Sequence, residues 1–170
     1  MAKKKVQDRG WLLEMAADFI APFEGFSPKV YKCPAGHLTF GFGSLIKNHK
    51  DVVCPITVQE ARQYMMMDLE PMLKAIDKLV KVDIGSNQLV ALLSFVYNLG
   101  QGNLGKSTLL KLLNDKKYEE AADEFLKWNK AMVNGKLTPL RGLTARREAE
   151  RQKFLMDISR VITSIMARKL

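Results

Sequence analysis

Hydrophobic positions in the first part of the chain follow two different periods. Apolar residues recur at helical spacing up to Glu24, which predicts a first amphipathic helix; they are Trp11, Leu12, Met15, Phe19, Ile20 and Phe23. From Val30 to Phe42, aromatic and β-branched residues alternate with Gly, Pro and Thr. This alternation indicates a β-hairpin, the only convincing one that we identify. Residues 44–56 are typical of a loop.

A long helix is predicted from Thr57 onward. Thr57 and Glu60 have the spacing of a capping box, in which each side chain bonds the other residue's backbone N–H. The side of the helix that we expect to be buried consists of Ala61, Tyr64, Met65, Leu69, Met72, Leu73, Ile76, Leu79 and Val80. Pro71 removes a hydrogen bond inside this helix, so we expect a bend there.

The remainder of the chain has helical periodicity. Thr138 and Pro139 suit the cap and first position of the last helix. The four helices predicted after the long one cover residues 87–98, 107–115, 118–131 and 139–168. The fold class is therefore α+β and mostly α. We expect a single domain over residues 1–170, with a small hairpin-containing lobe at about 11–56, a connecting helix at 57–81 and a helical lobe at 82–170.

Composition narrows the class of protein. A chain of 170 residues that is 47% hydrophobic has enough apolar side chains for a packed core. Cys33 and Cys54 make no disulfide framework, and their spacing fits no zinc site. We expect no metal and no cofactor, and synthesis in a reducing compartment.

Charge indicates an anionic partner but does not choose one. The chain holds 27 Lys and Arg against 18 Asp and Glu, a net charge of +9. Nucleic acid, an anionic membrane and the bacterial cell wall all fit this balance. Lys3–Lys5 look like the start of a signal peptide, but charges at Asp8, Arg9, Glu14 and Asp18 interrupt the following apolar residues. Neither an export signal nor a membrane span is predicted.

One segment combines an acid, a thiol and a hydroxyl around a tight turn. It consists of Glu24-Gly25-Phe26, and then Tyr31-Lys32-Cys33-Pro34-Ala35-Gly36-His37-Leu38-Thr39-Phe40-Gly41-Phe42-Gly43. A glutamate beside apolar residues can serve as a general acid in glycosidic bond hydrolysis. By themselves these residues also allow a solvated glutamate, a buried structural cysteine and an ordinary strand threonine. His37 and His49 look like ordinary loop residues.

The same segment resembles the active-site motif of phage-type lysozymes, the T-even phage lysozyme-like glycoside hydrolases. Further similarity lies at 87–100, 104–110 and 142–150, so the resemblance spans about residues 11–155. It implies that Glu24, Cys33 and Thr39 are catalytic. Cys33 stands where the best-known members carry aspartate, and Cys occurs in many prophage members. Ser44 departs from the histidine that commonly follows the final glycine.

The resemblance also implies residues outside the motif. By position, Leu45, Tyr97 and Ser107 fall where relatives line the saccharide cleft, although Leu45 and Tyr97 also suit core packing. In relatives an arginine from the C-terminal lobe pairs with the catalytic glutamate. Arg141 is the candidate here and Arg146 the alternative.

The function implied is an endolysin-type muramidase, which cuts the β-1,4 bond between N-acetylmuramic acid and N-acetylglucosamine in bacterial peptidoglycan. We expect a monomer, made in the host cytoplasm and reaching the wall after holin-type release. A lytic transglycosylase and a non-catalytic basic wall-binding protein are the alternatives. Nucleic acid is not expected as a partner, since no helix suited to reading bases is recognisable.

The C-terminal residues extend beyond the resemblance. They carry an apolar stripe of Ile158, Val161, Ile162, Ile165 and Met166 with Arg160, Arg168 and Lys169 around it. A packed final helix is favoured. The alternative is a basic amphipathic helix that contacts an anionic outer-membrane surface.

Overall fold

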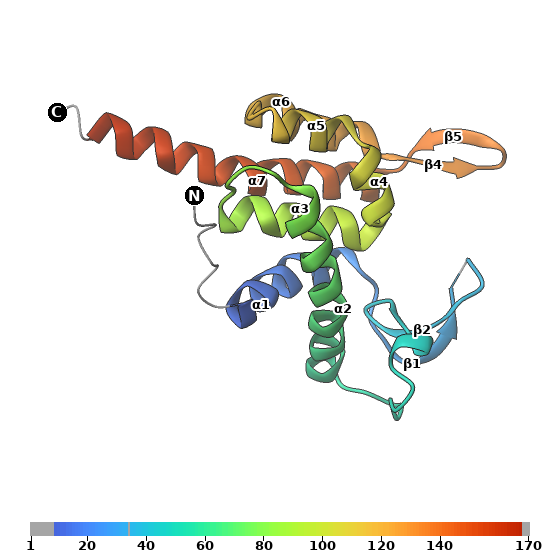
Figure 1. Ribbon diagram of the computed structural model, residues 1–170. Coiled ribbons are helices and arrows are strands. Elements are labelled where there is room, and N and C mark those ends of the chain that lie inside the picture. Colours follow the sequence, from blue (N-terminus) through green and yellow to red (C-terminus); the bar gives the residue numbers. More distant parts are fainter. Residues whose placement is uncertain (1–8, 34, 168–170) are drawn as a thin grey trace. The chain divides into compact units, whose positions relative to one another are not determined.

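The computed structural model describes residues 9–33 and 35–167, with side chains through Asp157 (Figure 1). The chain divides into two units, with the boundary between Leu73 and Lys74 inside helix α2 (Val58–Leu79). Most described residues are helical, and two small antiparallel sheets accompany the helices. The predicted class, α+β and mostly α, is confirmed. Within the described part of the chain, no helix has the length and apolar character needed to cross a membrane.

The first unit begins with α1 (Arg9–Ile20) and the short 3₁₀ helix η1 (Ala21–Phe23). The buried face of α1 consists of Leu12, Leu13, Ala16, Ala17 and Ile20. The predicted helix therefore reaches Glu24 in two parts. Pro22 explains the change, because proline disfavours an α conformation at the residue before it.

A three-stranded antiparallel sheet follows, in the order β1 (Ser27–Lys32), β2 (Leu38–Gly41) and β3 (Ser44–Leu45). The first two strands are the hairpin expected from the alternation, which is confirmed. The third strand and the 3₁₀ helix η2 (Ile46–Asn48) lie in the segment expected to be a loop. A two-residue strand is too short to show an alternating pattern, so the sequence did not indicate it.

One face of this sheet packs on α2. Phe40 is fully buried, and its ring meets the rings of Tyr64 at 5.0 Å and His49 at 5.8 Å, edge to face. Gly41 has φ +60°, and a Cβ there would lie 3.0 Å from the Ala61 Cβ. A side chain at Gly41 would therefore be both strained and crowded.

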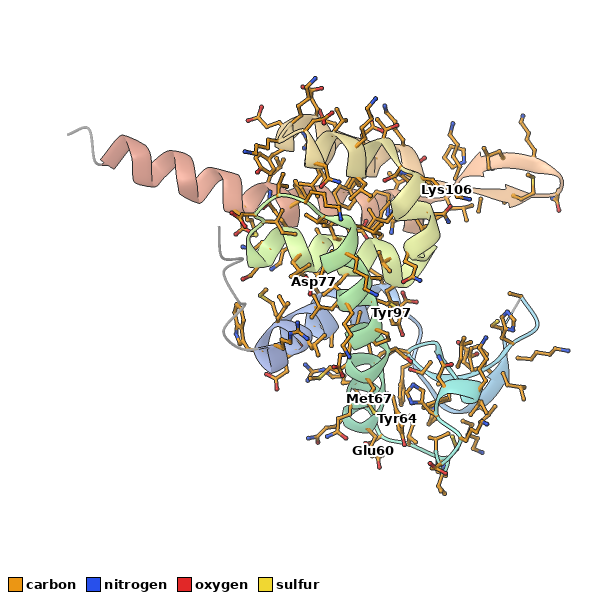
Figure 2. All side chains as sticks on the ribbon, in the orientation of Figure 1. Glu60, Tyr64, Met67, Asp77, Tyr97 and Lys106 are labelled. Carbon is orange, nitrogen blue, oxygen red and sulfur yellow. The ribbon has the colours of Figure 1, made fainter. Side chains whose placement is uncertain are left out.

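The capping box at the start of α2 is confirmed. The Thr57 N–H donates to Glu60 Oε2 at 2.7 Å, and the Glu60 N–H donates to Thr57 Oγ1 at 3.2 Å. Figure 2 shows Glu60 and Tyr64 on the first turns of this helix. Pro71 is exposed inside the helix, which continues through it. The expected bend at Pro71 stays a prediction.

In the second unit, the most buried helix is α3 (Ser86–Leu99), which packs along α7 (Arg141–Ala167). Every residue of α3 from Asn87 to Val96 is buried. Around this pair lie α4 (Gln101–Lys106), α5 (Thr108–Asn114), α6 (Tyr118–Glu124) and η3 (Phe125–Trp128). Phe125 joins the core, with its ring 5.7 Å from that of Phe95 and 5.6 Å from that of Phe154.

Two predictions for this unit are wrong. The helix expected over 118–131 ends at Glu124, and residues after it form a second hairpin of β4 (Lys130–Val133) and β5 (Lys136–Pro139). Asn134 and Gly135 both have positive φ, at 49° and 76°, which is the turn that an Asn-Gly pair favours between antiparallel strands. Consequently Pro139 ends a strand, and the last helix starts at Arg141.

Helix α4 lies between the helices predicted over 87–98 and 107–115, where no helix was predicted. Gly100 has φ +87° and ends α3, and α4 starts at the next residue. Two glycines in a six-residue helix give no periodic pattern from which to predict it.

Candidate active site

Glu24 lies where the helical part of the first unit gives way to the sheet. Its N–H donates to the Ala21 carbonyl at 3.1 Å, and its own backbone is extended, with φ −105° and ψ 140°. The aromatic residues on either side are anchored. The Phe23 ring packs on Phe19 at 5.7 Å, and the Phe26 ring on Phe42 at 5.5 Å. The half-buried Glu24 side chain therefore projects from a chain segment that is fixed at both ends.

Cys33 opens the turn between β1 and β2. Its N–H donates to the His37 carbonyl at 2.9 Å, and its carbonyl accepts from the Gly36 N–H at 2.8 Å. Gly36 has φ +86°, a conformation that glycine adopts at little cost. Pro34, inside the turn, lies outside the described residues. The Cys33 thiol is free and half-buried.

Thr39 occupies the middle of a row of side chains that crosses all three strands. It is the register partner of Tyr31 on β1 and of Leu45 on β3. Register partners project from the same face of a sheet, and so does a residue two positions along the strand. Cys33 follows the last residue of β1, two positions after Tyr31, the register partner of Thr39. Thr39 is 3% exposed, and its hydroxyl donates to the Tyr31 carbonyl at 3.3 Å.

Glu24 and Cys33 stand at opposite ends of β1. The pairing of β1 with β2 is irregular between Ser27 and Tyr31. A bulge of this kind bends a strand and turns its side chains to new directions. The structure thus unites the predicted catalytic residues in one unit, with Thr39 and Leu45 on one sheet face and Cys33 directly after β1.

Ser44, which replaces the family's usual histidine, is a buried residue on the opposite sheet face. It pairs with Phe40, is 1% exposed, and its Oγ has no hydrogen-bond partner in the described part of the chain. Its place on the sheet therefore separates it from the row that holds Thr39 and Leu45.

The view of His49 as an ordinary loop residue is wrong. Its side chain is buried, and Nε2 lies 2.8 Å from Asp68 Oδ1 on α2. The His49 ring also packs edge to face on Tyr64, at 5.0 Å. Asp68 falls at apolar spacing on α2, seven residues after the buried Ala61. A polar residue within an apolar stripe indicates a buried polar contact, and this was the sequence signal for the pair of His49 and Asp68. Among the described residues, including His49 and Asp68, no three His, Cys, Asp or Glu side chains gather as metal ligands.

The remaining predicted residues belong to the second unit. Tyr97 is half-buried near the end of α3. Ser107 caps α5: its Oγ accepts from the Leu110 N–H at 3.1 Å and donates to the Leu104 carbonyl at 2.7 Å. Its hydroxyl proton is thus already in use. Arg141 is exposed as the first residue of α7.

A buried polar network joins α3 and α7 within the second unit. Glu150 Oε1 accepts from Ser94 Oγ at 2.6 Å, Arg147 Nη2 at 2.9 Å and Arg146 Nε at 3.2 Å. Arg146 Nη2 also donates to the Ser94 carbonyl at 3.1 Å. Burial raises the pKa of Glu150, against the opposing effects of Arg147, of the Ser94 hydrogen bond and of Arg146. Of the four residues in this network, the family resemblance pointed only to Arg146.

Comparisons with known proteins agree with this architecture. Residues 21–150 match the family model described as phage lysozyme. An endolysin of Acyrthosiphon pisum secondary endosymbiont phage 1 is 39% identical over 135 residues, covering 79% of this chain and 91% of that protein.

Two solved structures are similar over most of their length. The endolysin from Escherichia coli O157:H7 phage FAHEc1 has a TM-score of 0.75 at 31% identity, covering 92% of this chain and 95% of that one. The muramidase domain of SpmX from Asticaccaulis excentricus has a TM-score of 0.76 at 30% identity, covering 84% and 95%. The chain belongs to the phage lysozyme family.

Proposed function

We propose that this phage lysozyme is an endolysin-type muramidase that hydrolyses the β-1,4 bond between N-acetylmuramic acid and N-acetylglucosamine in peptidoglycan. The family match over residues 21–150, the endolysin relative and the similar muramidase domain support the reaction class. The observation that carries the assignment of residues is the position of Glu24. It is half-buried between anchored aromatic residues and directly precedes the sheet that holds Cys33 and Thr39.

Glu24 acts as the general acid in this proposal. Its protonated carboxyl gives a proton to the glycosidic oxygen as the bond from that oxygen to the anomeric carbon breaks. The sugar then carries oxocarbenium character, and Glu24 is left as a carboxylate. The neighbouring Phe23 and Phe26, whose rings pack on Phe19 and Phe42, fix the backbone on either side of this acid.

Cys33 and Thr39 handle the attacking water. The Thr39 hydroxyl donates a hydrogen bond to the Tyr31 carbonyl, which leaves the Thr39 oxygen lone pairs to accept a hydrogen bond from water. The Cys33 thiolate takes the other water proton as the oxygen joins the anomeric carbon. The water enters from the face opposite the leaving group, so the product anomer is inverted.

Substrate contacts beyond the reacting bond are proposed from the family resemblance. Leu45, in the same row as Thr39, offers an apolar surface to a sugar ring. Tyr97 offers an aromatic ring for stacking, and Ser107 offers lone pairs while its proton stays in the cap of α5. Arg141, with Arg146 as the alternative, is proposed as the cation that pairs with Glu24.

The substitution Glu24→Gln tests the proposal most directly. Glutamine keeps the shape of the side chain but has no proton to donate, so wall hydrolysis should fall at least about a hundredfold. Clearing of a suspension of purified sacculi measures the rate. Glu14→Gln, an exposed position on α1, is the matched control and should keep full activity. Substantial lysis by a folded Glu24→Gln protein would show that the acid lies elsewhere.

Mass spectrometry of the products separates the hydrolase from its closest chemical alternative. A hydrolase leaves reducing muramic acid ends, whereas a lytic transglycosylase leaves anhydro ends that are lighter by one water. The free thiol at Cys33, in place of the usual carboxylate, is the observation that keeps this alternative in view. Anhydro products would identify a lytic transglycosylase and contradict the muramidase assignment.

For its site of action, we propose that the enzyme is made in the host cytoplasm and acts on the wall once a holin-type lesion releases it. The wall is anionic, and the net charge of +9 suits that substrate. The outer-membrane contact expected of residues 158–170 concerns side chains outside the described residues.

A further inference from the structure

The β4–β5 hairpin carries exposed apolar side chains. Met132 and Leu137 are 67% and 58% exposed, and they are register partners on neighbouring strands, so they lie side by side on one face. Val133, next to the turn, is 39% exposed and points to the other face. Figure 1 shows the hairpin projecting from the helices of its own unit. Its end is therefore apolar on both faces.

The charges on the hairpin itself have one sign. Residues 130–139 contain two lysines and no acidic residue. Lys130 and Lys136 lie on the two strands, and both are exposed. Their register partners are Pro139 and Val133, so the two lysines project from opposite faces. Neither lysine forms an ion pair within the described part of the chain, and their charges are available to an outside anion.

The apolar residues and lysines on both faces of the hairpin favour one kind of partner over others. A folded protein or a second copy would cover one face of the hairpin, and would leave the apolar residue on the other face in water. A soluble wall glycan that stacked on one apolar face would likewise leave the other face in water. A fluid bilayer surface receives the hairpin end-on and covers both faces, while the lysines on either side meet anionic headgroups.

We propose that the β4–β5 hairpin docks this lysozyme on the surface of an anionic phospholipid bilayer. Met132, Val133 and Leu137 enter the interface, and Lys130 and Lys136 bind headgroup phosphates. Binding there concentrates the enzyme at the membrane beside its wall substrate. The proposal does not depend on the roles assigned to Glu24 or Cys33.

The test is co-sedimentation of the full chain with vesicles of phosphatidylglycerol and phosphatidylethanolamine, beside neutral phosphatidylcholine vesicles. Wild type should partition to the anionic vesicles, and added salt should weaken this binding. The double substitution M132T/L137T keeps strand-forming residues and should lower partitioning at least about tenfold. The double substitution K130Q/K136Q should lower it by about fivefold for each lysine.

Two controls make the outcome specific. V53T/M67T changes two apolar residues of the first unit, 83% and 58% exposed, and should bind vesicles like wild type. All variants should digest lipid-free sacculi at the wild-type rate. The proposal is overturned if wild type ignores anionic vesicles, if both hairpin variants bind unchanged, or if the control loses as much binding. Slower digestion of lipid-free sacculi by the hairpin variants would identify a wall contact instead, and a hairpin-dependent dimer in size-exclusion chromatography would identify a second copy.

Discussion

At the scale of single residues, the role of the Cys33 thiol decides the mechanism of this lysozyme. A thiolate is a strong nucleophile, so direct attack on the anomeric carbon is chemically available and would retain the anomer. Water activation is favoured by Thr39, whose hydroxyl donates its hydrogen bond to the Tyr31 carbonyl and so keeps lone pairs free to accept one from water. Cys33 follows the last residue of β1, two positions after Tyr31, the register partner of Thr39.

Substitutions at Cys33 should distinguish base from nucleophile. Cys33→Asp should stay active, with its pH–rate profile moved to lower pH, because a carboxyl ionises several pH units below a thiol. Cys33→Ala should be severely impaired, since nothing then accepts the water proton. The measurement is the rate of sacculus digestion against pH, with the product anomer determined by NMR.

Alkylation gives an independent check on Cys33. A thiol reagent should inactivate wild type and spare Cys33→Asp, and Cys54→Ala controls for the second free thiol. Full activity in Cys33→Ala would make the thiol a spectator. A retained anomer would replace water activation by covalent catalysis.

At the scale of single elements, the start of α2 depends on its capping box. Thr57→Ala removes the hydroxyl that accepts the Glu60 N–H and donates to the Glu60 carboxylate. We expect a loss of about 1 kcal/mol in the free energy of unfolding at neutral pH. Urea denaturation measures it, and Gln59→Ala in the same exposed turn is the control.

The cost of Thr57→Ala should also depend on pH. The hydrogen bond from the Thr57 backbone N–H, followed by that from its hydroxyl, lowers the pKa of Glu60. A lowered carboxyl pKa stabilises the fold above its ordinary value, and the contribution disappears as pH falls through the folded pKa. The difference between Thr57→Ala and wild type should therefore shrink in acid. A difference that grows in acid would contradict the capping role.

At the α3–α7 junction, we expect stability to depend on pH in the opposite direction. Burial raises the pKa of Glu150, so the folded protein binds the Glu150 proton more tightly than the unfolded chain does. That contribution is complete below the ordinary glutamate pKa, and it is lost as pH rises through the raised value. Wild type should therefore lose stability relative to Glu150→Gln over this range.

Urea denaturation of both proteins from about pH 4 to about pH 8 measures this change. Glu148→Gln, an exposed position on the same helix, should show no such trend relative to wild type. If wild type instead gained stability over Glu150→Gln as pH rose, the two arginines rather than burial would dominate the site.

At the scale of the whole molecule, the structure indicates where the chain can be shortened. Asp157 accepts hydrogen bonds from Asn87 Nδ2 at 2.8 Å and from the Gln88 N–H at 3.0 Å, and so caps α3. Phe154, one turn earlier, is fully buried. Removing residues 158–170 should therefore spare the hydrolysis of soluble peptidoglycan fragments.

A longer truncation from Phe154 onward is the comparison. It removes a core ring and the α3 cap together, and should lower the melting temperature sharply. Circular dichroism and fragment hydrolysis are measured on both proteins. Complete loss of hydrolysis in a folded 1–157 protein would show that the C-terminal residues take part in the reaction.

The amino-acid sequence by itself determined those elements whose signal lies within a few neighbouring residues. The capping box from Thr57 to Glu60, the long apolar run of α3 and the alternation before Phe42 are signals of this kind. The order of a hairpin followed by helices follows from them, and so does the motif that runs from Glu24 to Gly43. Because these patterns are local, they survive without knowledge of what packs on them.

Tertiary structure decided the features that join distant residues or that override a local preference. His49 is buried because Asp68, nineteen positions later, accepts its hydrogen bond. Glu150 on α7 is buried against α3, where the Ser94 hydroxyl donates a hydrogen bond to its carboxylate. The β4–β5 hairpin, by contrast, has a local signal in the Asn134-Gly135 turn, although a helix was predicted over its first strand. Long-range contacts such as those of His49 and Glu150 depend on which surfaces meet, and no window of neighbouring residues contains that information.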